Sequence, residues 1–212
     1  MIYLLILVKL LRHLQKAIIE ISDHIKSITE CLDYNSIEKV INVLIKAREK
    51  GRKILVVGAG RSGLVGKSFA MRLMHLGFNV YVVGETITPS VKEEDILIAI
   101  SGSGRTQVVV TVAAAAKRMG AKIIAITSHP DSPLGRISDY MIRIPGRTKI
   151  AKEVDYFTRQ VLGIYEPLAP LGTLFEDSTL VFFDGLVVEL MQRLKITEAD
   201  MKKRHANVEF PM

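Results

Sequence analysis

Six residues, Ser101 to Thr106, follow directly after an apolar run and read SGSGRT. The preceding residues 96–100, ILIAI, have the composition of a strand that is buried on both faces. Two glycines, three hydroxyl groups and a positive charge make up the next six residues, and no apolar core requires that composition. Backbone amides, hydroxyls and a helix N-terminus together bind phosphate, because the amides and the helix dipole favour negative charge. The segment therefore predicts a loop that holds a phosphate monoester.

We expect the three hydroxyl groups of this loop to contact the phosphate directly and its backbone amides to complete the cradle. The residues concerned are Ser101, Gly102, Ser103, Gly104, Arg105 and Thr106. The guanidinium of Arg105 either adds a charge-assisted hydrogen bond or stays in solvent beside the loop.

A second glycine-rich loop lies earlier in the chain, in VVGAGRSG at 56–63. Gly58, Gly60 and Gly63 have the spacing of the dinucleotide fingerprint, and Glu85 lies about where a ribose-binding acid is expected. This pattern alone indicates an NAD-dependent oxidoreductase, although glycines after a first strand also simply permit a tight turn.

If both loops serve one ligand, Ser62 contacts the part of the ligand beyond the phosphate. Arg61 either faces the substrate or is an exposed loop arginine that needs no ligand. Glu85, together with Thr86 and Thr88, is expected to border the same pocket through weak contacts.

The elements around these loops alternate between strand and helix. Runs rich in Val, Ile and Leu at 53–58, 79–84, 96–100, 122–127 and 140–144 predict strands, with helices at 62–76 and 106–120 between them. This order indicates a doubly wound α/β fold, in which a parallel sheet of about five strands is flanked by helices. Ligands of such sheets bind at the carboxyl ends of the strands, near a switch point in strand order, and both loops lie at carboxyl ends.

The N-terminal 34 residues predict an amphipathic helix that is separate from the domain at 35–212. Its apolar seam comprises Leu4, Leu7, Leu11, Leu14, Ile18, Ile21, Ile25 and Ile28. We expect this seam to mediate subunit association, with packing on its own domain as the alternative. A second helix follows, for which Asn35 and Glu38 resemble a capping pair and Gly51 an exit.

The chain has 212 residues, 29 Lys and Arg against 22 Asp and Glu, and a formal net charge of +7. The basic residues are spread along the chain, and no nucleic-acid-binding motif accompanies them, so small anions are better partners than nucleic acid.

The single cysteine, Cys31, fits a reducing cytoplasm. Scattered histidines predict no metal site. The apolar start meets Lys9 too soon to predict a membrane span or a signal peptide.

The segment 145–170 is unusually long for an irregular connection within a compact domain, and its length predicts a functional loop or lid. Tyr156, Arg159 and Gln160 within it are expected to close over a ligand. Helices are expected from TLFED at 173–177 to the C-terminus, as a helical extension of the domain.

The two loops together resemble those of the sugar isomerase (SIS) family of phosphosugar domains. The wider set FAMRLMHLGF, VGETITPS, SGSGRT, EPLAPLGTLFED and KKRHAN is similar to that of the 6-phospho-3-hexuloisomerases within this family, over roughly residues 35 to 209. The apolar N-terminus departs from that pattern.

This resemblance implies a five-stranded parallel sheet and assembly as a homo-oligomer, usually a dimer of dimers. It implies interconversion of D-arabino-hex-3-ulose 6-phosphate and fructose 6-phosphate through a 2,3-enediol, without a metal or other cofactor. A hexulose-phosphate synthase is then the metabolic partner that supplies the substrate.

The resemblance carries the family's base onto Glu176 and its histidine onto His205, which would act in the site of a neighbouring subunit. A carboxylate suits the chemistry, because one base can serve both carbons from one face of the planar intermediate. However, Thr173 and Glu176 also have the spacing of a capping box. His205 is alternatively one more residue of a basic terminal helix, and His75 is expected to serve packing.

Two other functions stay open at this point. The first is a non-catalytic sugar-phosphate sensor on the same fold, although no helix-turn-helix segment precedes the sheet. The second is the NAD-dependent oxidoreductase indicated by the first loop.

Overall fold

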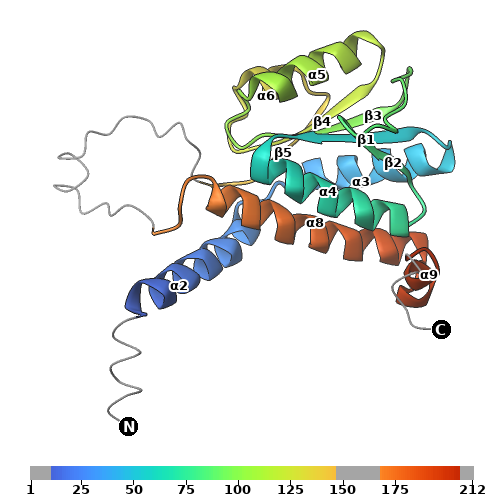
Figure 1. Cartoon of the computed structure of the whole chain (residues 1–212). Helices are drawn as coiled ribbons and strands as arrows, with labels where there is room; N and C mark the ends of the chain where they lie inside the picture. The colour runs from blue at the N-terminus through green and yellow to red at the C-terminus, as the bar shows by residue number, and fades with distance from the viewer. Residues whose placement is uncertain (1–10, 147–167, 206–212) are drawn as a thin grey trace.

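The computed structural model describes residues 11–146 and 168–205. Its centre is a five-stranded parallel sheet with the order β2-β1-β3-β4-β5 (Figure 1). The strands are β1 (Lys53–Gly58), β2 (Asn79–Val82), β3 (Ile96–Ile100), β4 (Lys122–Thr127) and β5 (Tyr140–Arg143). The predicted doubly wound α/β fold is confirmed.

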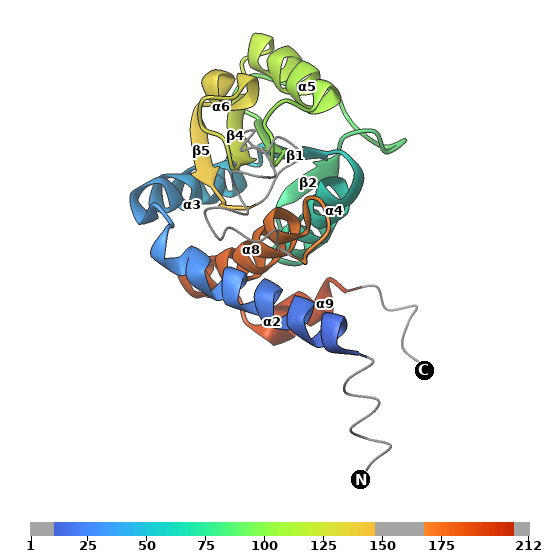
Figure 2. The ribbon, with the colours of Figure 1, turned by 90° about the vertical axis from the view of Figure 1, so that its left-hand side faces the viewer.

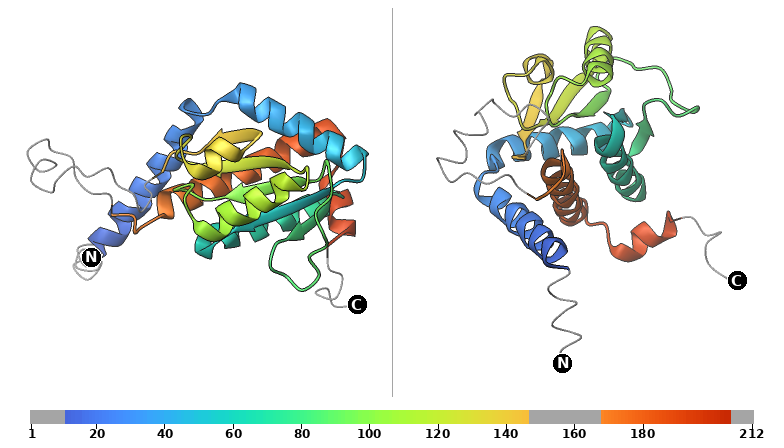
Figure 3. Two further views of the ribbon diagram at one scale, coloured as in Figure 1. Left: turned by 90° about the horizontal axis from the view of Figure 1, so that it is seen from above. Right: turned by 60° about the vertical axis from the view of Figure 1, so that its left-hand side comes forward.

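Helices cover both faces of this sheet (Figure 3). One face carries α3 (Tyr34–Glu49), α4 (Gly60–His75) and α8 (Thr173–Leu194), and the other carries α5 (Gln107–Arg118) and α6 (Pro133–Ile137). The strands are apolar throughout because successive side chains enter opposite cores: Ile54 and Val56 face α4, whereas Leu55 and Val57 face α5.

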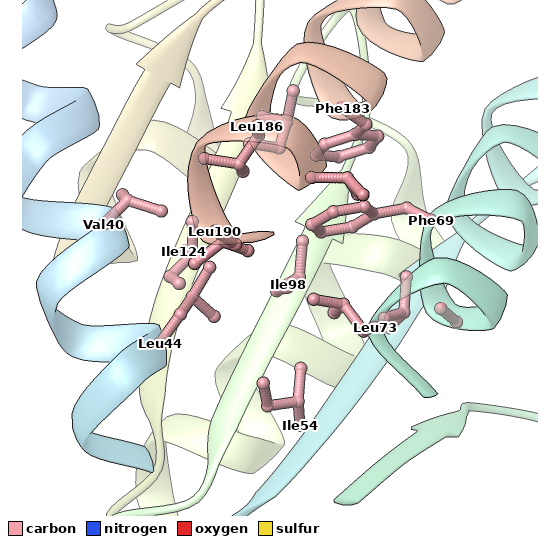
Figure 4. Packing of buried hydrophobic residues seen from close by; sticks show 14 of the residues in the cluster. Val40, Leu44, Ile54, Phe69, Leu73, Ile98, Ile124, Phe183, Leu186 and Leu190 are labelled. Carbon is pink, nitrogen blue, oxygen red and sulfur yellow. The ribbon is translucent and has the colours of Figure 1, made fainter. Parts of the chain in front are cut away.

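The long helix α8 lies between α3 and α4 and completes the larger core. Figure 4 shows its side chains Phe183, Leu186 and Leu190 above the sheet, between those of the two flanking helices. The rings of Phe69 on α4 and Phe183 stack with their centroids 4.0 Å apart. This packing fixes the position of α8 relative to the sheet. The first turn of α8 supplies part of the site described below.

The start of α3 differs from the predicted capping pair. The N-cap is Asp33, whose carboxylate accepts from the amides of Asn35 and Ser36. Asn35 is therefore inside the helix, and Glu38 instead pairs with Arg193 at 2.7 Å. The expected exit is confirmed, since Gly51 follows the helix with φ at 62°.

The N-terminal helix α2 (Arg12–Ser27) runs beside α8 and away from the sheet (Figure 2). Leu4 and Leu7 of the predicted seam lie outside the described residues, and the rest of the seam divides in two. Ile28, in the following 3-10 turn η1 (Ile28–Glu30), is buried, and Ile21 and Ile25 are partly covered, whereas Leu14 and Ile18 are exposed. Packing on its own domain thus accounts for the second half of the seam. Among the helices that the structure describes, none is long and apolar enough to span a membrane.

A buried carboxylate joins the first residues of the two central strands. Asp95, directly before β3, accepts from Lys53 N at 2.9 Å and from Lys92 N at 2.8 Å, and its Oδ2 lies 2.8 Å from Lys53 Nζ. Burial by itself raises the pKa of Asp95, but the hydrogen bonds from Lys53 and Lys92 outweigh it. The pKa of this carboxyl therefore lies below its ordinary value of 3.8.

The variant Asp95→Asn should be less stable than wild type by about 3 kcal/mol at pH 7, because it leaves Lys53 without its buried partner. The folded-state pKa is lowered, so this stabilisation is present above pH 3.8 and is lost as the pH falls through the folded-state value. Urea denaturation at several pH values measures the difference, with the exposed Asp131→Asn as control. A difference that does not shrink in acid would contradict the assignment.

Candidate active site

A cavity of about 460 Å³ opens at the carboxyl ends of β1 and β3. These two strands are neighbours, while β2 lies on the far side of β1, so the cavity occupies the switch point in strand order. Its lining residues are Ala59, Gly60, Arg61, Ser62, Gly102, Ser103, Thr106, Pro170, Leu171, Gly172, Thr173, Phe175 and Glu176. Both glycine-rich loops and the start of α8 thus meet at one place.

The loop after β1 is shaped by a close approach of strand and helix. A side chain at Gly63 would come within 2.8 Å of the carbonyl oxygen of Gly58, and one at Gly58 would meet the backbone of Ser62 at the same distance. The fingerprint spacing therefore has a packing reason within this chain. This tight turn places Arg61 and Ser62, in the first turn of α4, on the cavity wall.

The loop after β3 is held from the neighbouring strand. The carbonyl oxygen of Gly102 accepts from Ser128 N at 3.0 Å and from Thr127 Oγ1 at 3.2 Å. The C=O and N–H of a trans peptide point in opposite directions, so the Ser103 amide faces away from β4 and toward the loop after β1. No acceptor for this amide occurs in the described part of the chain. It is available to an anion in the cavity.

Other residues of this loop stabilise its conformation through contacts outside the cavity. The hydroxyls of Ser101 and Thr106 lie 2.9 Å apart, and Gly104 has φ at 61° where any side chain would collide with the buried Ser132 hydroxyl. Arg105 is exposed. Ser101, Gly104 and Arg105 do not line the cavity, so their contacts with a ligand stay predictions.

Glu176 reaches the cavity from the first turns of α8 and meets Arg61 there. Arg61 Nε lies 2.7 Å from Glu176 Oε2, and its Nη2 donates to Asp177 Oδ1 at 3.0 Å. The Glu176 side chain is 14% exposed and that of Arg61 is 57% exposed. One guanidinium therefore bridges two consecutive carboxylates and links the loop after β1 to α8.

The structure does not contain the capping box of Thr173 and Glu176 that the sequence offered as an alternative. Helix α8 begins one residue earlier than the box requires, with Gly172 as N-cap and Thr173 as the first helical residue. The glycine leaves room for the carboxylate, since a side chain there would lie 3.2 Å from Glu176 Oε1. Glu176 is thus directed at the cavity and Arg61, and its service as the base stays a prediction.

Pro170, the last residue of the expected lid, and Leu171 form the third wall of the cavity. The segment before it is tied to the N-terminal helix, because Glu20 accepts from the amides of Leu168 and Ala169 at 3.0 and 3.4 Å. This link joins residues 148 positions apart, so no local signal could reveal it. Tyr156, Arg159 and Gln160 of the expected lid lie outside the described residues.

His205 lies far from this cavity within its own chain. It follows α9 (Glu198–Lys203), and Figure 1 places α9 at the opposite end of α8 from Thr173. The 22 residues of α8 span roughly 33 Å at 1.5 Å per residue. His205 instead lines a second cavity of about 620 Å³ with His75, at 5.2 Å between ring centroids. Its predicted role therefore requires another subunit.

His75 is buried beside His205 rather than near the first cavity. Burial, followed by the nearby His205 and Arg72, lowers the pKa of His75 below its ordinary value. Glu85, the acid expected for ribose, forms an exposed ion pair with Lys67 at 2.6 Å. Neither Glu85 nor Thr88 is among the described residues that line the first cavity.

Comparison with known proteins gives consistent results. The family model "SIS domain" matches residues 48–163. A 3-hexulose-6-phosphate isomerase of Methanocaldococcus jannaschii is 42% identical over 82% of this chain and 84% of its own, and one of Bacillus subtilis is 42% identical over 74% and 80%. A crystal structure from Methanococcus jannaschii, whose inferred molecular function is 3-hexulose-6-phosphate isomerase, is 39% identical with a TM-score of 0.70, covering 93% of this chain and 99% of that one.

The variant Thr127→Val should bind inorganic phosphate about three- to tenfold more weakly, because it removes one hydrogen bond to the Gly102 carbonyl oxygen and thereby loosens the peptide that orients the Ser103 amide. Isothermal titration calorimetry measures the affinity, and Thr111→Val on the exposed side of α5 is the matched control. Equal affinities for wild type and both variants would show that the Gly102 carbonyl does not govern anion binding.

Proposed function

The chain belongs to the SIS domain family, and on this basis we propose that it interconverts D-arabino-hex-3-ulose 6-phosphate and fructose 6-phosphate through a 2,3-enediol. The observation that carries this proposal is the meeting of the anion-binding loop and the Glu176 carboxylate in one cavity. The curated relatives named 3-hexulose-6-phosphate isomerase support the choice of substrate.

In this proposal the phosphate lies at the N-terminus of α5. Thr106 is the N-cap of α5, and its side chain caps no helix amide. The Ser103 amide and hydroxyl, the Thr106 hydroxyl and the dipole of α5 bind the phosphate oxygens. The sugar then extends past Ser62 toward α8, with its second and third carbons next to Glu176. A cavity of about 460 Å³ has the size of a small-molecule site.

Glu176 acts as the proton carrier in this arrangement. Its carboxylate removes the proton from C2 of the hexulose phosphate and returns it to C3, while the hydroxyl proton moves between the two oxygens. One carboxylate suffices because both carbons present the same face of the planar enediol to it. Phe175 and the Pro170–Leu171 wall line the cavity beside it and limit access of water to the intermediate.

The proposed enzyme is a homo-oligomer in which His205 serves the site of a neighbouring subunit. Exposed apolar side chains support association: Leu14 and Ile18 on α2, and Leu64 and Met71 on α4. The large separation of His205 from the first cavity within one chain also favours a role between subunits.

The variant Glu176→Gln should fold as wild type and lose turnover by about 10²- to 10⁴-fold, because it keeps the shape of the side chain and removes the base. Proton NMR of fructose 6-phosphate in D₂O measures this: wild type should introduce deuterium at C3, and the variant should not. Glu189→Gln on the same helix is the control. Exchange at C1, or exchange that survives in Glu176→Gln, would refute the assigned reaction or the assigned base.

Mixing Glu176→Gln subunits with His205→Ala subunits should restore part of the activity that each variant lacks, because some mixed sites combine an intact Glu176 with an intact His205. Native mass spectrometry confirms that subunits have exchanged before turnover is assayed. Complete exchange without recovery would exclude a role of His205 in a neighbouring site.

A further inference from the structure

The contact between Arg61 and two neighbouring carboxylates is more elaborate than the proposed base requires. Glu176 contacts the guanidinium through Nε, and Asp177 contacts it through Nη2. Because different nitrogens are used, one contact can break while the other persists. Glu176 lines the cavity, whereas Asp177 does not and is about one third exposed. Only the first of the two carboxylates can therefore exchange a proton with a ligand in the cavity.

Proton abstraction moves negative charge from the protein to the substrate. The proton on C2 passes to the Glu176 carboxylate, the electron pair of that C–H bond forms the C2–C3 double bond, and the carbonyl oxygen on C3 becomes negative. Glu176 is then neutral. Arg61 thereby loses the negative charge of Glu176 at the moment when a new negative charge forms on the substrate oxygen in the same cavity.

We propose that Arg61 follows this charge and stabilises the enediolate oxygen, and that Asp177 is the positioning residue that holds the guanidinium at the cavity while Glu176 is protonated. The proposal rests on the isomerase function proposed above. A cationic donor already in place when the charge develops lowers the barrier without reorganisation. In the described part of the chain, Glu176 and Asp177 are the ion-pair partners of Arg61.

A purely structural ion pair is the alternative, and the chain contains a matched example of it. Arg193 is also shared by two carboxylates, Glu38 and Glu189, both at 2.7 Å. That group joins α3 to α8 and does not line the cavity at Arg61. Glu189→Gln therefore removes one of two carboxylates from a shared arginine without touching the site, and it controls for the general effect of such a change.

The anchoring role can be measured without turnover, by ¹⁵N NMR of arginine guanidinium groups in the whole protein. Loss of a signal in Arg61→Lys assigns the resonance. Rotation about the Cζ–Nη2 bond of Arg61 should be slow in wild type and in Glu189→Gln, and fast in Asp177→Asn. Equal rotation rates in wild type and Asp177→Asn would overturn the anchoring role of Asp177.

Kinetics measure whether the anchor serves catalysis. Asp177→Asn should lower kcat by about tenfold with KM changed less than about twofold, because the phosphate loop still binds the ground state. Arg61→Gln should lower kcat by about 10²-fold, and the double variant should equal Arg61→Gln, since Asp177 acts through Arg61. Asp177→Glu should recover most of the activity.

Two kinetic outcomes would also overturn the inference: a wild-type kcat in Asp177→Asn, or a double variant in which the two losses multiply. These outcomes are distinct from failure of the proposed function, in which wild type itself neither converts fructose 6-phosphate nor exchanges its C3 proton. In that case the rotation measurement still decides whether Asp177 anchors Arg61.

Discussion

The adjacency of β1 and β3 at the centre of the sheet is the constraint on which the site depends. Parallel pairing, from Ile54 opposite Ile96 to Gly58 opposite Ile100, brings the two strands to an end at the same edge. The chain then leaves β1 and β3 on loops that face each other across one cavity. Pairing of β3 with β4 is also required, because it places Thr127 where its hydroxyl donates to the Gly102 carbonyl oxygen.

Charge links these loops to the last long helix. The sheet and the core between α3 and α4 fix the position of α8, but it is Arg61 that connects the first turns of this helix to the loop after β1. The cavity therefore has the Ser103 amide and hydroxyl groups at one end and, at the other, Arg61 with the Glu176 carboxylate. This polarity suits a ligand with an anionic ester at one end and exchangeable protons at the other, as in a sugar phosphate.

The sequence predicted the sheet and both glycine-rich loops, because runs of apolar residues and glycine-rich turns are local signals. Glu176 was singled out by the resemblance to the SIS family, and its role as the base stays a prediction. It was less reliable for helix starts: Asp33 caps α3 in place of Asn35, and Gly172 caps α8, since caps depend on backbone angles as well as residue type. Asp177 was missed although it follows Glu176 directly. Its relevance comes from Arg61, 116 positions away, and no spacing rule covers such a contact. Hydroxyl residues at the end of β4 were a usable signal for Thr127.

The most direct test of this account is a crystal structure of the protein with fructose 6-phosphate bound. We expect phosphate oxygens within hydrogen-bonding distance of the Ser103 amide, and the second and third sugar carbons beside the Glu176 carboxylate. A sugar bound with its phosphate away from the loop after β3, or with those carbons remote from Glu176, would contradict it.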